Sequence, residues 1–115
     1  MAALMTFELT HGYKVGEVTH LEVGLRELNS GDYIDAQMAS EKVVVVNGEA
    51  VAYTSNVLYG LELLCRQVEF IGKVNGPLEE KDLRKLHQDD FALLQEKAKE
   101  LDEMIVKELE QRGRS

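Results

Sequence analysis

The stretch NGPLEEKDLRKLHQDDFALLQ, residues 75–95, separates two differently built halves of the chain. Before its Gly-Pro pair, which contains the only proline, lie β-branched runs and glycines; after it, Leu, Glu, Lys and Gln recur at helical spacing. We therefore predict an α+β fold, with a small N-terminal antiparallel sheet or set of hairpins followed by a helical C-terminal half. With no repeat or linker visible, residues 1–115 are predicted as a single domain, with 1–54 mainly β plus one short helix and 55–115 mainly α.

The charged residues of this stretch fit two helix starts. Glu79 and Glu80 fall in the first turn of a short helix, and Asp89 and Asp90 in the first turn of the next. Carboxylates there accept hydrogen bonds from free backbone N–H groups and complement the positive end of the helix dipole. His87 lies in the link, at the C-terminal end of the short helix, where a cation is also favourable.

The alternative is a metal or acid–base site made by His87, Asp89 and Asp90, as in a small enzyme or ligand-binding domain. Such a site needs a third or fourth ligand fixed by the fold, and the other histidines, His11 and His20, lie far away in the strand region. We favour the helix starts and predict no catalytic, cofactor-binding or metal-binding residues.

Bulk composition excludes several classes of function. Hydrophobic residues make up 44% and charged residues 30% of the 115, typical of a globular protein. The net charge is −8 without a Lys/Arg stripe, which disfavours nucleic-acid and anionic-membrane partners. The single cysteine, Cys65, permits no internal disulfide and is predicted to be a buried, inert thiol on a helix face. Without a signal-like N-terminus or a spanning apolar run, we expect a cytoplasmic protein.

The clearest local signal in the first half is a β-hairpin. Val43–Val46 is a β-branched run, Asn47-Gly48 tolerates the positive φ angles of a tight turn, and Glu49–Tyr53 forms the returning strand. Four adjacent valines need cover on both faces, so an exposed arm is the competing interpretation. The other expected elements are a strand at Phe7–Leu9 turned back by His11–Gly12, an alternating strand at Val18–Arg26, and a helix capped by Ser30 or Asp32 that ends near Ser40.

Three helices are expected in the second half: Ser55 or Asn56 to Ile71 with Gly72 as the stop, about Glu79–Leu86, and about Asp89–Gln111. The last carries an apolar stripe that extends further than a domain of this size can cover. Its far part is the candidate subunit or partner contact, comprising Leu101, Met104, Ile105 and Leu109.

Two stretches resemble a known family. LEVGLRELNSGDYIDA, residues 21–36, and IGKVNGPLEEKDLRKLHQDDFALL, residues 71–94, are similar to segments of the tail assembly chaperone family of Mu-like bacteriophages. The resemblance runs from about Val18 to Leu101, and the family commonly has Pro where Leu28 stands here. Arg26, Glu27 and Asp32 match its motif, and we interpret Asp32 as a helix cap and Arg26–Glu27 as the strand's wet edge.

The resemblance implies a non-enzymatic role. Such proteins bind the tape-measure protein and keep it soluble until tail-tube subunits polymerise around it, and they are absent from the finished virion. In many such phages a ribosomal frameshift also yields a longer version. Exposed apolar patches of this kind favour self-association, so a homo-oligomer is expected. The alternative is a stable structural or adaptor component of the tail.

Overall fold

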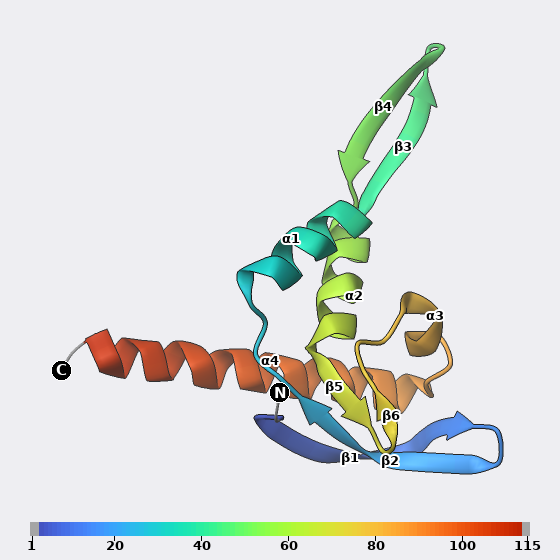
Figure 1. The fold of residues 1–115 in the computed structure, drawn as a ribbon. Helices are drawn as coiled ribbons and strands as arrows, with labels where there is room; N and C mark the ends of the chain where they lie inside the picture. The colour runs from blue at the N-terminus through green and yellow to red at the C-terminus, as the bar shows by residue number, and fades with distance from the viewer. Residues whose placement is uncertain (1–2, 114–115) are drawn as a thin grey trace.

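The fold combines one antiparallel sheet, a separate hairpin and a long helix (Figure 1). The computed structural model describes residues 3–113, and within them the sheet has four strands in the order β1-β2-β5-β6, while β3 and β4 pair only with each other. This architecture confirms the predicted α+β class. The elements are β1 (Met5–Val15), β2 (Val18–Leu25), α1 (Ser30–Ala39), β3 (Glu41–Val46), β4 (Glu49–Thr54), α2 (Asn56–Gln67), β5 (Val68–Ile71), β6 (Val74–Asn75), α3 (Glu80–Leu83) and α4 (Gln88–Gly113).

The first hairpin differs from its prediction. The chain does not turn back at His11–Gly12; β1 continues to Val15, and the turn comes at Gly16, where φ is +61°. Gly12, at φ +93°, lies instead in an irregularity of the β1–β2 ladder between Glu8 and Tyr13. At Gly12 the positive φ therefore serves a bulge rather than a chain reversal. The bulge leaves the backbone amides of residues 10–12 free to bond outside the β1–β2 ladder.

The predicted central helix is shorter than expected. Of the two predicted caps, Ser55 is the one that caps α2, accepting a hydrogen bond from the amide of Leu58, but the helix ends at Gln67. Residues Val68–Ile71 form β5, which pairs antiparallel with the end of β2. Gly72, predicted to stop the helix, instead adopts φ +58° in the turn from β5 to β6. Two strands of the sheet therefore come from the half that was predicted as mainly helical.

The core lies where α2, α3 and α4 meet the sheet. Leu25 of β2, Ile71 of β5 and Leu94 of α4 are completely buried. The remaining buried members of the same cluster are Leu9, Tyr13, Val23, Leu64, Cys65, Val68, Leu78, Leu83, Leu86, Ala98 and Leu101.

A capping box and an ion pair fix α1 to the sheet. The N-cap is Asn29 rather than Ser30 or Asp32; its side chain accepts from the amide of Asp32, whose carboxylate accepts from the amide of Asn29. Arg26 is not a wet edge, because only 16% of its side chain is exposed and its guanidinium donates to both oxygens of Asp32, at 2.8 and 2.9 Å. Arg26 also lies 3.7 Å from Glu69 of β5. Arg26 and Asp32, two of the residues that match the family motif, therefore connect the end of β2 with the start of α1, and Arg26 also reaches β5.

The β3–β4 hairpin projects from the body as an arm (Figure 1). Every residue of both strands is exposed, as the competing interpretation expected. Its base is closed by a 2.9 Å hydrogen bond from the amide of Ser55 to the carbonyl of Ser40. The radius of gyration is 16.4 Å, against about 13 Å for a compact domain of this length. The arm and the free end of α4 account for this elongated shape.

Candidate partner-binding surfaces

The predicted contact residues on α4 differ in accessibility. Leu101 is only 2% exposed and belongs to the core, so it presents no surface to a partner. Ile105 is half-buried against the same core. Met104 and Leu109 are 55% and 58% exposed. The C-terminal part of α4 extends beyond the sheet (Figure 1). Partner contact stays a prediction, and Met104 and Leu109 are the residues free to make it.

An open groove between α2 and α4 was not predicted. It encloses about 740 Å³, and its lining includes Leu61 and Leu64 of α2 and Phe91 and Ala98 of α4. Gly60 lies at its edge, where a Cβ atom would meet nothing within 4 Å. The one sequence feature that could have indicated this groove was Gly60. A glycine in the interior of a helix lowers stability, so its presence there suggests a packing or binding role.

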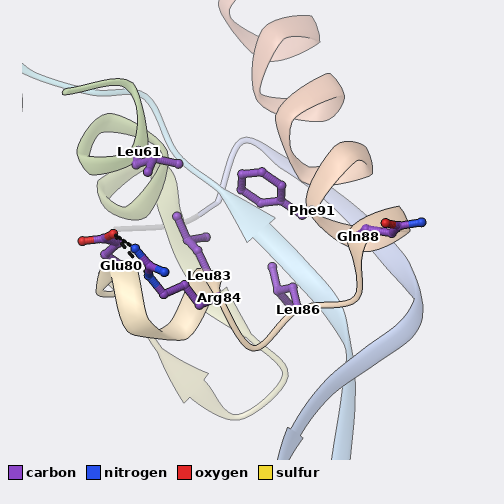
Figure 2. Close-up of a pocket in the computed structure, with 7 residues that line it drawn as sticks. All are labelled: Leu61, Glu80, Leu83, Arg84, Leu86, Gln88 and Phe91. Atoms are coloured by element: carbon purple, nitrogen blue, oxygen red, sulfur yellow. Dashed lines mark hydrogen bonds and ion pairs between the residues drawn. The ribbon is translucent and has the colours of Figure 1, made fainter. Parts of the chain in front are cut away.

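A second apolar hollow of about 300 Å³ adjoins this groove. In Figure 2 the side chains of Leu61, Leu83, Leu86 and Phe91 point toward this opening, with the Glu80–Arg84 ion pair at one side. Leu61 and Phe91 line both hollows, so an apolar surface continues from α3 along the α2–α4 groove. Apolar side chains of a helical partner have the right shape and chemistry to fill such a groove.

The two faces of the hairpin arm differ in chemistry. Cross-strand partners point to the same side, so Val43 and Ala52 share a face with Val45 and Ala50. This face carries no charge along those four positions, and Val43 and Val45 are 66% and 75% exposed. The opposite face mixes apolar and charged side chains: Lys42, Val44, Val46, Glu49, Val51 and Tyr53.

The start of α4 is tied to the β1 bulge by a buried carboxylate. Asp90 is completely buried and accepts hydrogen bonds from the amides of Thr10, His11 and Gly12 at 2.7, 2.9 and 2.9 Å. Burial acts to raise the pKa of Asp90, but the three backbone hydrogen bonds outweigh it and the pKa is lowered. Asp90 therefore joins two elements that are distant in sequence, rather than only complementing its own helix.

The same junction brings His11 next to His87 and Asp89 of the 75–95 segment, contrary to the expectation that His11 lies far from them. Its ring stacks on that of His87, with centroids 3.6 Å apart and an interplanar angle of 14°. Its Nε2 lies 3.2 Å from Oδ2 of Asp89, and Nδ1 of His87 lies 3.5 Å from the same oxygen. His20 is elsewhere, with Nδ1 3.4 Å from the amide nitrogen of Lys73.

Cys65 is completely buried, and burial raises the pKa of its thiol to about 12. It is the inert core thiol that was predicted. Among residues 3–113, none of the helices is both long and apolar enough to cross a membrane.

Fold and surfaces together define a small α+β protein with apolar surface left uncovered on the arm, in the α2–α4 groove and on the end of α4. Residues 9–114 match the sequence family described as tail assembly protein gp41, and the chain belongs to this family of Mu-like phage proteins. The resemblance noted in the sequence is thereby confirmed.

Curated relatives agree with this assignment. The chain is 40% identical over 111 residues to "Mu-like prophage FluMu protein gp41" of Haemophilus influenzae, covering 96% of this chain and 87% of the relative. It is 40% identical over 105 residues to "Probable tail assembly protein gp41" of Escherichia phage Mu, covering 89% and 73%. A longer phage Mu relative, "Probable tail assembly protein FS-gp41", is 43% identical over 84 residues, which are 71% of this chain and 45% of that protein. No solved structure matches.

Proposed function

We propose that this protein is a tail assembly chaperone that binds the tape-measure protein and keeps it soluble in the host cytoplasm while the tail is assembled. The role requires reversible apolar contact and no catalytic group. Membership of the tail assembly family supports the general role. The α2–α4 groove supports the specific role, because its open lining is mainly apolar, with polar residues such as Gln95 and Lys99 beside it, and suits one face of an amphipathic helix.

Charge and shape are consistent with holding an insoluble partner. A net charge of −8 keeps the chain and its complexes apart in solution. The exposed apolar side chains lie on three separate surfaces: the arm, the α2–α4 groove and the end of α4. Several protomers along one long helical partner would cover more of it than a single groove does. We therefore include a homo-oligomer in the proposal, with tail-tube subunits displacing the chaperone during polymerisation.

The direct test is co-expression with the tape-measure protein of the same phage, followed by pull-down and light scattering. We expect a soluble complex where the tape-measure protein alone is insoluble. If the tape-measure protein stays insoluble and this chain is instead recovered in purified particles, it is a structural tail component and the chaperone proposal fails.

A matched pair of substitutions at Gly60 tests the groove itself. Gly60→Ala and Gly60→Glu each remove a helix-interior glycine, so each should stabilise α2 by roughly 0.5–1 kcal/mol. Only the Glu variant places a charged side chain at the edge of the groove. We expect Gly60→Ala to solubilise the tape-measure protein normally and Gly60→Glu to lose this ability. Equal solubilisation by both variants would exclude the groove as the binding site.

A further inference from the structure

We propose that His11, His87 and Asp89 form a binding site for a borderline transition-metal ion, Zn²⁺ being the first choice. Among the described residues, these three alone form a group whose possible ligand atoms all lie within 4.8 Å of one another. All three side chains are exposed, so an ion reaches them without opening the fold.

The distances between the three ligand atoms are close to those of a tetrahedral metal site. Nε2 of His11 and Nδ1 of His87 approach one carboxylate oxygen of Asp89, at 3.2 and 3.5 Å. An ion about 2.0–2.1 Å from each of its tetrahedral ligands holds those ligands roughly 3.3 Å apart. The two rings must open slightly from their stack for both nitrogen lone pairs to meet at one point, and water would complete the coordination.

Each of the three side chains is available to bind a metal ion. In the described structure the only ion-pair partners of Asp89 are the two histidines. Nδ1 of His87 accepts a hydrogen bond from the amide of Asp89 at 3.1 Å, so it carries the lone pair that a metal would take. That amide lies at the exposed start of α4, where water can replace the lost hydrogen bond.

The fold holds the two sides of the site together. His11 lies on the bulge whose amides bind the buried Asp90, and Asp89 is the residue before Asp90. The backbones that carry the ligands are therefore fixed before any ion arrives, which lowers the ordering cost of binding. Two imidazoles and a carboxylate suit Zn²⁺ or Ni²⁺, whereas Mg²⁺ prefers oxygen ligands and water.

The test is calorimetric titration of ZnCl₂ into tag-free, chelator-treated protein near neutral pH, since metal binding requires neutral imidazole. We expect one ion per chain, a higher unfolding temperature with Zn²⁺, and no effect of MgCl₂. His11→Ala, His87→Ala and Asp89→Asn should each weaken binding by about tenfold or more. These exposed side chains lie outside the core, so circular dichroism of each variant should match that of the parent.

His20→Ala is the matched control, because it removes the remaining histidine and leaves the cluster intact. Its affinity for Zn²⁺ should equal that of the unmodified chain. Absence of saturable binding, or equal weakening by His20→Ala and His11→Ala, would overturn the proposal. The readout does not involve the tape-measure protein, so the outcome is independent of the proposed chaperone role.

Discussion

Asp90 shows how a single buried side chain connects parts of the chain that are far apart in sequence. The bulge around Gly12 presents three consecutive amides, and one carboxylate satisfies all of them. Without this carboxylate, three part-buried backbone amides of β1 would lose their acceptor, and the first turn of α4 would lose its link to β1. The residue therefore sets the position of the longest helix relative to β1.

We predict that Asp90→Asn destabilises the protein by roughly 2–3 kcal/mol, because charge-assisted hydrogen bonds become neutral ones and the new NH₂ group faces backbone donors. Urea unfolding followed by circular dichroism measures this change. Asp89→Asn is the neighbouring control, since Asp89 is exposed and should change the unfolding free energy by less than about 0.5 kcal/mol. Equal effects at both positions would contradict the structural role of Asp90.

The lowered pKa of Asp90 predicts a specific acid dependence. A carboxylate whose folded pKa is depressed contributes its stability above the unfolded pKa of about 4, and loses it as the pH falls through the lowered folded value. The stability difference between the unmodified chain and Asp90→Asn should thus be constant from pH 5 to 7 and shrink below about pH 4. Urea unfolding of both proteins across this range checks the sign; a difference that grows in acid would refute it.

At the residue scale, the sequence indicates that Asp89 and Asp90 lie at a helix start, but it does not indicate which residues they contact. Asp89 and Asp90 have the composition of a helix start, and α4 does begin beside them. Neither residue indicates that its neighbours come from β1, because that contact depends on a bulge created by Gly12. The contact of His11 with His87 and Asp89 could not be predicted for the same reason, since 78 positions separate His11 from Asp89.

At the scale of elements, the segment Val68–Ile71 shows where periodicity fails. Leu64, Cys65, Val68 and Ile71 are spaced as on a helix face, yet the helix ends at Gln67. Val68 and Ile71 are also β-branched, and the open edge of β2 offers hydrogen bonds that a longer helix would leave unused. The sequence of this segment is therefore compatible with both a helix and a strand, and the pairing with β2 selects the strand. The β3–β4 hairpin was predicted correctly because its Asn47-Gly48 turn is encoded locally.

The end of α4 gives a prediction at the same scale. Replacing Met104 and Leu109 with Glu should leave the unfolding free energy within about 0.5–1 kcal/mol, because both side chains are already exposed. It should reduce self-association or tape-measure binding if this end is a contact. Size-exclusion light scattering and the co-expression assay measure the two effects. Glu108→Gln is a control on the same turn, and unchanged assembly in the double variant would remove this helix end from the binding surface.

The whole molecule consists of a packed body with two extensions, the hairpin arm and the far part of α4 (Figure 1). The sequence predicted the fold class and each of the four described helices, although α2 and α3 are shorter than predicted, because caps and periodic stripes are local. It did not predict the strand order, in which β5 follows a helix and returns to the edge of β2. Nor did it predict the groove, which exists only once α2 and α4 have been positioned by the same sheet.

We predict that the arm can be removed without unfolding the body. Replacing residues 42–53 with a short Gly-rich link should preserve one cooperative unfolding transition, because none of these side chains is buried and Ser40 and Ser55 are hydrogen-bonded at the base. Solution X-ray scattering should give a smaller radius of gyration for this variant than for the intact chain measured in the same way, because the arm extends the molecule. A molten or aggregated product would instead mean that the arm contributes to folding.

The closure at Ser40 and Ser55 also bears on how this protein family changes over time. Because the two ends of the arm meet within one hydrogen bond, residues can be gained or lost between them in pairs without moving α1 or α2. Lineages that meet different partners should therefore vary in length here first, with Asn47-Gly48 as the point of insertion, while the Asp90 anchor keeps the rest of the chain in register.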